Sequence, residues 1–507
     1  MLFRFFLPSG VSRLSSKSSP GQFAGPDSRY PVPDPYFRRL CSQLLCWCAV
    51  VFFLLAGSGC TTGLSGSSSQ IELPARFSSE GGAPLPDQWW QALGDEVLDD
   101  LMDRALTGNL NLKIAWARLN QAQAQARISG AGIFPSLEGQ AGLSRSWLHE
   151  SGRTDENGSY RLALLASYEV DLWGRIRSQR DAALLDATAG QQELQAAALT
   201  LSAQVATTWY QLIEQNGQAR ILEQQIQTNT QLLELIRLKV RTGQAGIADL
   251  LQQQQLIQTS RGELARLRSR AQVLGHQLAV LLGLPPDRPV APGVDSLPAL
   301  PLLPETGLPA ELVQRRPDIR AAWARLQAAD QRLSVAAAER FPRLSLSGQL
   351  GSEAENIGDL FDNWLATLAG NLIGPIIDGG RRRAEMARTQ AVVAEELHSY
   401  GQIVLNALTE VEDALVRERQ QLLYIEKLER QQLLAEQAIE RIRDRYINGG
   451  EDYQRVLTAQ LSLQGVQRNR LTAQRELYEF RIQLCRALAG SWELEPSASL
   501  NRVGLRS

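Results

Sequence analysis

The sequence has 507 residues, a length that corresponds to about three globular domains of typical size. Aromatic residues make up only 6% of it, too few for three large cores, whereas alanine and glutamine are abundant and favour long helices. The 52 basic and 54 acidic residues nearly balance, which gives no support for a nucleic-acid-binding protein. Three histidines and five cysteines leave little material for a metal site.

Residues 1–59 have the pattern of a secretory signal peptide with a long n-region. Two arginines precede the apolar run Leu40–Ala56, and small residues follow it up to Cys60. A cysteine in this position resembles a bacterial lipoprotein cleavage site, where Cys60 would be acylated and become the N-terminus, although Gly57 replaces the usual leucine. The alternative is an ordinary signal peptide with an incidental Cys60. We expect residues 60–85, rich in Ser and Gly after Cys60, to form a lipid-anchored flexible tether.

The first half of the remaining chain predicts a helix near residues 110–133, two strands, a very long helix and a further helix near 247–282. The long helix, Arg175–Arg241, contains no proline and would extend roughly 100 Å at ~1.5 Å per residue. The two flanking helices together are nearly as long, so both could pack along it. Taken alone, these helical segments would favour a cytoplasmic coiled coil.

The chain contains a duplication with a period of 207 residues. Trp116 corresponds to Trp323 (323 − 116), and Phe134-Pro135 corresponds to Phe341-Pro342 at the same offset. The helix 382–447 corresponds in the same way to the long helix of the first half. We therefore predict a first repeat over 86–283, a proline-rich connector over 284–316, a second repeat over 317–490 and a C-terminal tail over 491–507.

Three predicted strands, at 136–144, 161–172 and 343–351, alternate between apolar and polar residues, and a weaker fourth candidate lies at 365–377. Their lengths approach the ~9–11 residues of a tilted membrane strand, although the same alternation occurs in half-buried soluble sheets. The signal peptide favours the membrane, because it directs the chain to the cell envelope. Four strands cannot close a barrel and open edges are not tolerated in lipid, so several chains must share one barrel.

Several motifs occur in a fixed order between about residues 85 and 490. They are Trp89-Trp90 before Gly94-Asp95, Tyr168–Arg175, Arg315–Arg320, Phe341–Gly348, Asp378–Arg382, Tyr446–Gly449 and Val456–Gln460. Together they resemble the TolC-type outer-membrane efflux protein family, specifically the lipoprotein branch of resistance-nodulation-division (RND) efflux systems. The resemblance implies a mainly α fold with a membrane β-barrel. Long α-helical hairpins would form a tunnel, and a homotrimer would form a twelve-stranded barrel with four strands from each chain.

The resemblance also implies a function. The protein would be a passive duct in the Gram-negative outer membrane, with no catalytic residues, cofactor or metal, through which drugs and other small amphiphilic compounds leave the cell. A periplasmic adaptor (membrane fusion) protein and an inner-membrane RND pump would be its partners, with the lipid of the outer membrane around it. The alternative is the outer-membrane component of a type I secretion or metal-efflux system of the same fold. A periplasmic adaptor would not account for the duplication.

The resemblance further places a closed constriction near the turns that follow the two long helices. Asp249 and Arg455 occupy equivalent positions in the two repeats, and Glu451 and Asp452 lie beside Arg455. We hypothesise that Asp249 and Arg455 face each other at this gate, together with Glu451 or Asp452. The alternative is that these are surface charges at helix starts, where acidic residues suit the helix dipole.

Overall fold

A computed structural model of the chain describes residues 72–288, 293–490, 492 and 494. The predicted signal peptide and Cys60 lie outside these residues. The chain divides into two units, Met1–Gly63 and Leu64–Ser507, and only the second contains described residues. No helix in the described part combines the length and the hydrophobicity that a membrane-spanning helix requires.

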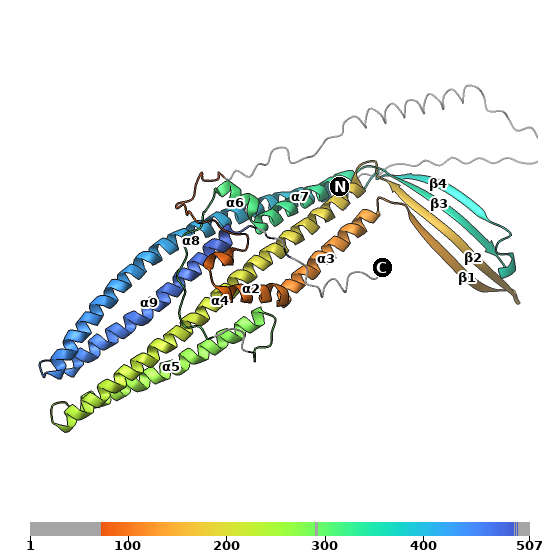
Figure 1. Ribbon diagram of the computed structural model, residues 1–507. Coiled ribbons are helices and arrows are strands. Elements are labelled where there is room, and N and C mark those ends of the chain that lie inside the picture. Colours follow the sequence, from red (N-terminus) through yellow and green to blue (C-terminus); the bar gives the residue numbers. More distant parts are fainter. Residues whose placement is uncertain (1–71, 289–292, 491, 493, 495–507) are drawn as a thin grey trace, which may run out of the picture. The chain divides into compact units, whose positions relative to one another are not determined.

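Each half of the described chain contains one helix of 67 residues, α4 in the first half and α8 in the second (Figure 1). A shorter helix precedes the strands of each half and another follows the long helix, and both pack along it. This arrangement confirms the predicted pairing. The bounds are α3 Leu110–Ala131, α4 Arg175–Arg241 and α5 Ile247–Leu281 in the first half, and α7 Pro317–Ala338, α8 Arg381–Ile447 and α9 Tyr453–Leu488 in the second. Shorter elements are η1 Trp89–Leu93, α2 Glu96–Gly108, α6 Pro309–Arg315 and η2 Ile357–Asp359.

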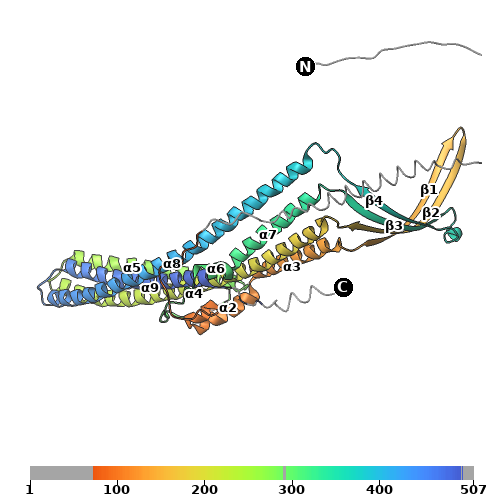
Figure 2. The ribbon, with the colours of Figure 1, turned by 90° about the horizontal axis from the view of Figure 1, so that it is seen from above.

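The two halves contact each other along α4. Arg325 and Arg332 of α7 form ion pairs with Glu193 and Asp186 of α4. Further along, α9 also packs on α4, so the hairpins α4–α5 and α8–α9 run side by side to their turns (Figure 2). The long helix of the first half is therefore the element on which the second half is assembled.

Four strands form one antiparallel sheet in the order β1-β2-β3-β4. The fourth strand, predicted from a weaker pattern, is confirmed, but it ends at Ile373 and not at residue 377. Pro375 lacks the N–H that would continue the ladder. The β1–β2 hairpin is longer than predicted, because its backbone pairing continues past the alternating residues. The bounds are β1 Ser136–Glu150, β2 Arg153–Val170, β3 Arg343–Ala354 and β4 Leu365–Ile373.

The strand register gathers the apolar side chains on one face of the sheet. Leu164 lies opposite Leu350, and Leu344 lies opposite Leu372. Directly paired residues share a face. The apolar face includes Leu137, Leu164, Leu346, Leu350, Leu368 and Leu372, and the other face includes Ser136, Gln140, Ser167, Ser347, Thr367 and Asn371. The predicted alternation is thus continuous across all four strands.

The strands join the helices at one place, which we call the joint. The indole Nε1–H of Trp173 donates a hydrogen bond of 2.7 Å to the carbonyl oxygen of Pro342, and its ring stacks on Phe341 at 4.7 Å between centroids. Gly174 and Gly380, at φ of 74° and 86°, immediately precede α4 and α8 and allow the chain to turn from strand into helix. At the joint, Trp173 of the first repeat thus contacts Phe341 and Pro342 of the second repeat.

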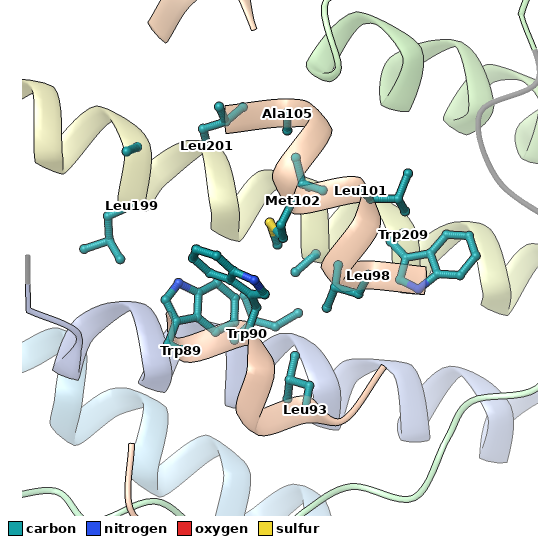
Figure 3. Packing of buried hydrophobic residues seen from close by; sticks show 14 of the residues in the cluster. Trp89, Trp90, Leu93, Leu98, Leu101, Met102, Ala105, Leu199, Leu201 and Trp209 are labelled. Carbon is teal, nitrogen blue, oxygen red and sulfur yellow. The ribbon is translucent and has the colours of Figure 1, made fainter. Parts of the chain in front are cut away.

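A cluster of buried tryptophans anchors the N-terminal helices to α4. In Figure 3 the rings of Trp89 and Trp90 lie between the η1 ribbon and Met102 of α2. The indole of Trp89 donates to Ser202 Oγ at 3.0 Å, and that of Trp209 donates to Asp95 Oδ2 at 2.9 Å. Asp95 also caps α2, because its Oδ1 accepts the backbone N–H groups of Val97 and Leu98. The Trp-Trp and Gly-Asp motifs therefore serve packing and capping.

The described part of the proline-rich connector lies against α9 and α4. Tyr478 donates its hydroxyl to the carbonyl oxygen of Pro298 at 2.6 Å, and Arg481 donates to those of Pro301 and Leu302 at 2.8 Å each. Arg481 also forms a buried ion pair with Glu418 of α8, and both side chains are only 4% exposed. One arginine thus joins the connector to two helices.

The end of the predicted tether is held on this connector. Ala83 forms a parallel bridge with Pro304, and the backbone N–H of Ser78 donates to Glu412 Oε1 at 2.9 Å. Thr306 donates its hydroxyl to the carbonyl oxygen of Ser79 at 3.0 Å. Residues 78–83 of the predicted tether 60–85 therefore have fixed partners in the body of the protein.

Replacing Arg481 by methionine leaves the Glu418 carboxylate buried without a partner. We expect a loss of about 3–5 kcal/mol in unfolding free energy, the range for breaking a buried ion pair. Arg268→Met, which removes an exposed pair with Glu223, should cost only about 0–1 kcal/mol. Thermal unfolding of the purified variants measures the difference. Equal melting temperatures for the two variants would contradict the role given to Arg481.

Candidate functional site

The candidate site lies at the turns that join α4 to α5 and α8 to α9. Both turns use the same backbone geometry, with a glycine in the left-handed region at Gly243 (φ 74°) and Gly449 (φ 78°). The N–H of Gln244 donates to the carbonyl oxygen of Lys239 at 2.7 Å, and that of Gly450 donates to Arg445 at 2.8 Å. Because the second residue after each long helix adopts this conformation, the two hairpins reverse direction within a few residues.

Two of the predicted gate residues cap the helices that follow these turns. Asp249 Oδ2 accepts the backbone N–H of Gly246 at 3.2 Å at the start of α5. Asp452 Oδ1 accepts the backbone N–H of Arg455 at 3.0 Å at the start of α9. Both contacts agree with the alternative interpretation, in which acidic residues stabilise helix starts.

The other two predicted residues pair with each other. Arg455 Nη1 lies 2.8 Å from Glu451 Oε1, and Arg445 lies 3.6 Å from the same oxygen. Within the described chain Arg455 has no ion pair with Asp249. The Glu451 side chain is largely buried, whereas that of Arg455 is exposed. The structure thus places all four residues at the hairpin ends but distributes them between two local contacts.

Lys239 makes a contact between the hairpins that sequence reasoning missed. Its Nζ donates to the carbonyl oxygens of Tyr446 and Ile447 at 2.9 and 3.3 Å, and lies 4.7 Å from the centroid of the Tyr446 ring. The lysine is 8% exposed although it carries a charge. A signal exists in the sequence, because Lys239 is a charged residue among the apolar residues Leu233, Ile236 and Val240, which recur at helical spacing on α4. It fixes the end of α4 to the last turn of α8.

The negative charge of Asp249 also acts on the second hairpin. Burial, together with the charge of Asp249, raises the pKa of both Tyr446 and Tyr453 above the ordinary tyrosine value. The rings of these two tyrosines lie 6.4 Å apart and belong to a small apolar cluster with Ile236 and Val456. Both phenols therefore remain neutral at physiological pH, and within the described chain the buried Tyr446 hydroxyl has no hydrogen-bond partner.

Behind this cluster the hairpins are joined by buried amides. Tyr453 donates its hydroxyl to Gln253 Oε1 at 2.7 Å, and Gln253 Nε2 donates to the carbonyl oxygen of Asn229 at 2.7 Å. Gln464 Nε2 in turn donates to Asn229 Oδ1 at 3.2 Å. The same kind of contact continues along α4 and α9, where Gln225 donates to Gln464 and Gln467, and Gln218 donates to Arg468 and Thr472.

The polar contact between α4 and α9 affects how easily the two hairpins can separate. When an apolar interface between helices opens, it exposes hydrophobic surface, which costs free energy in proportion to its area. Amide hydrogen bonds exchanged for hydrogen bonds to water cost much less, about 0.5–1.5 kcal/mol each. The two hairpins can therefore separate over the polar stretch without exposing a large apolar surface. Among the described residues no group of three or more His, Cys, Asp or Glu side chains is arranged to hold a metal ion.

Comparison with known proteins supplies the family. The profile of a family described as outer membrane efflux protein matches residues 101–284 and 308–490. The chain is 33% identical over 466 residues to the pyoverdine export outer membrane protein OpmQ of Pseudomonas putida, covering 89% of this chain and 98% of that protein. It is 30% identical over 417 residues to the toluene efflux pump outer membrane protein TtgI of the same species, covering 79% and 86%. Its fold is similar to that of the outer-membrane channel OprN, with a TM-score of 0.79, 27% identity and coverage of 84% of this chain and 98% of that one.

Proposed function

Because the chain belongs to the outer membrane efflux protein family, we propose that it is the passive exit duct of a tripartite efflux system in the Gram-negative outer membrane. Small amphiphilic compounds pass through it, and a periplasmic adaptor and an inner-membrane RND pump deliver them. The observation that carries this proposal is the sheet, whose register separates one apolar face from one polar face. Such a sheet suits lipid on one side and a water-filled lumen on the other.

The dimensions of the sheet support a membrane location. The nine residues of β4 extend about 30 Å at ~3.3 Å per residue. A tilt of about 35–45° reduces this to about 21–25 Å, which matches the ~25 Å apolar band of membrane barrels. Charged residues in the outer part of the β1–β2 hairpin, including the ion pair of Arg145 with Glu156, then lie beyond the lipid.

A homotrimer completes the barrel. Within the described chain β1 pairs only with β2, and β4 pairs only with β3, so the sheet has two open edges. Lipid offers no partners for the N–H and C=O groups of such edges. Because the strands alternate in direction, β4 of one chain can pair antiparallel with β1 of the next. Three chains give twelve strands, and the long helices, about 100 Å each at ~1.5 Å per residue, continue the duct through the periplasm.

Arginine on the lipid face tests both the membrane location and the export function. Leu368 lies near the middle of β4 and is 87% exposed in the single chain. We expect Leu368→Arg to destabilise the barrel by about 2–4 kcal/mol, as for a cation at the bilayer midplane. The neighbouring Thr367→Arg, on the polar face, should be tolerated. The measurements are the amount of trimer in outer membranes and the efflux of a fluorescent dye from cells that depend on this protein.

These outcomes separate the alternatives. Equal trimer levels and equal efflux for the two arginine variants would show that the apolar face does not contact lipid. A type I secretion or metal-efflux system of the same fold is distinguished in the same cells, by following a secreted polypeptide or resistance to metal salts instead of the dye. Efflux of those cargoes, without efflux of the dye, would replace the proposed substrate class.

We propose, in addition, that the hairpin ends form the gate. Asp249, Glu451, Asp452 and Arg455 all lie there, and Lys239 fastens one hairpin to the other. In this proposal the closed state holds the ends together through the bonds of Lys239, and engagement of the adaptor and pump replaces them. The helix-capping contacts of Asp249 and Asp452 keep the starts of α5 and α9 ordered during that movement.

The gate is tested by single-channel recording. Lys239→Met removes two charge-assisted hydrogen bonds of about 1.5–3 kcal/mol each, so the open state should become at least about tenfold more populated. Asp249→Ala and Arg455→Ala should also raise conductance and drug permeability, whereas Arg266→Gln, an exposed residue of α5, should not. Unchanged conductance and drug permeability in the Asp249 and Arg455 variants would remove these residues from the gate.

We also propose that residues 1–59 are cleaved as a signal peptide and that Cys60 carries the lipid anchor. Cys60→Ser should then abolish incorporation of labelled palmitate. Cys485→Ser is the control, because burial raises the pKa of the Cys485 thiol to about 12 and keeps it unreactive. Palmitate retained in the Cys60→Ser protein would contradict the anchor, and so would an unmodified Cys60 in the mass of the mature N-terminal peptide.

A further inference from the structure

The joint between sheet and helices carries arginines without ion-pair partners. Arg340, Arg381 and Arg383 are exposed, and no carboxylate of the described chain pairs with them. Within the described chain their one side-chain hydrogen bond is from Arg340 to the thioether sulfur of Met386, at 3.6 Å. Arg382 holds the end of α7 against the start of α8, since it donates to the carbonyl oxygen of Glu339 at 2.7 Å and pairs with Asp378 at 3.2 Å. This contact places Arg340, at the end of α7, near Arg381 and Arg383, at the start of α8.

The first repeat pairs the arginines of its joint within the chain. Counted from the glycine that precedes each long helix, Arg381 and Arg383 correspond to Arg175 and Arg177. Arg175 and Arg177 are both ion-paired, with Glu169 and Asp171. Arg340 corresponds to Ile133, 207 residues earlier. The unpaired charge is therefore a property of the second repeat alone.

The helix itself gives no reason for the arginines. Arg381 and Arg383 lie in the first turn of α8, which contains no acidic residue. Cations are disfavoured at this end of a helix, because the dipole is positive there. An anion bound beside them would offset this unfavourable interaction.

The residues around the arginines point to a membrane surface. Ile376 and Ile377, which precede them, are 96% and 91% exposed, and the first-repeat equivalent of Ile376 is the ion-paired Glu169. Phe134 and Phe341 lie at the strand ends of the two repeats and are also exposed. At the connection between β3 and α7 the order from strand to helix is therefore apolar strand, Phe341 and Arg340, and after β4 it is apolar strand, Ile376-Ile377 and Arg381. This is the order found where a membrane protein leaves the hydrocarbon and enters the headgroup region.

We propose that Arg340, Arg381 and Arg383 bind the phosphate groups of anionic phospholipids in the periplasmic leaflet, while Ile376 and Ile377 contact the acyl chains. The proposal rests on the membrane location of the sheet given under the proposed function. Guanidinium groups suit this ligand, because they donate two parallel hydrogen bonds to a phosphate. Lipid bound here would hold the start of α8 at the bilayer surface.

A second copy of the chain is the other possible occupant, and the charges disfavour it. The carboxylates beside the strand ends, Glu169, Asp171, Glu339 and Asp378, each pair with an arginine of their own chain. Glu138 of β1 is the remaining acidic strand residue near the joint, and it lies on the polar face of the sheet, opposite Leu165. A neighbouring copy thus offers at most one free carboxylate for three arginines.

The experiment compares the full-length protein with two triple variants. In the first, Arg340, Arg381 and Arg383 are replaced by glutamine; in the second, Arg261, Arg270 and Arg441, exposed arginines of α5 and α8 far from the joint, are replaced in the same way. Phosphatidylglycerol is titrated into the detergent-purified trimers and the adducts are counted by native mass spectrometry. Each arginine near an anionic lipid strengthens binding about fivefold, so the first variant should bind roughly a hundredfold more weakly. The second should bind as the unmodified protein does, and phosphatidylcholine should not distinguish the three.

Other outcomes assign the arginines differently. Equal phosphatidylglycerol binding by all three proteins would overturn the proposal. If the first variant instead loses trimer stability in detergent without lipid, and Glu138→Gln reproduces that loss, the arginines bind a neighbouring copy. A protein that forms trimers but shows no preference for anionic lipid contradicts only this inference. A protein that does not insert into bilayers at all contradicts the proposed function instead.

Discussion

Inside a bilayer the backbone has no water with which to form hydrogen bonds, and this constraint determines how the rest of the molecule must be built. Two edges of the four-stranded sheet are left without partners in a single chain. In lipid they can be satisfied only by other copies, so the sheet cannot function alone. The helices that continue from each strand then inherit the symmetry of the closed barrel. The joint has to transmit that geometry, which explains why Trp173 of one repeat is hydrogen-bonded to Pro342 of the other.

The middle and the hairpin end of the long helices are stabilised by different interactions. Near the middle of the helices, buried tryptophan and leucine side chains and the buried ion pair of Arg481 with Glu418 form a contact that resists rearrangement. Toward the hairpin ends the contact between α4 and α9 changes to glutamine and asparagine, with only a small apolar cluster at the tip. An apolar middle and polar hairpin ends are compatible with bending movements confined to the hairpin ends, because hydrogen bonds to water can replace those between amides.

The sequence allowed much of the fold to be predicted, and the limits are instructive. The long helices were predictable because α4 lacks proline and has apolar residues at helical spacing between Leu222 and Val240, and an equally long helix recurs in the second repeat. The lipid-facing parts of the strands were predictable from alternation. The outer half of the β1–β2 hairpin was not, because residues in water on both faces, such as Arg145 and Glu156, carry no alternation.

The candidate site was less predictable. Charged residues such as Asp249 and Arg455 could be located at the turns, but whether a carboxylate caps a helix or pairs with a distant arginine depends on which elements meet in space. The sequence shows that Lys239 stands among apolar residues, but its role was missed because its partners are backbone carbonyl oxygens, which have no signature in the sequence. The unpaired arginines of the joint became apparent only when the contacts of the two repeats could be compared one by one.

The hydrogen bond between Ser78 and Glu412 sets how many residues would be free to connect a lipid anchor at Cys60 to the body of the protein. Glu412 lies about 47 Å along α8 from Arg381 at ~1.5 Å per residue, so Ser78 is held well away from the membrane end of the helix. The roughly 18 residues from Cys60 to Ser78 can extend at most about 60 Å. If Cys60 carries the proposed acyl group, this length lets it reach the bilayer with few residues in excess. A segment shorter by a third would then be too short to reach the membrane unless Ser78 was released from its contact.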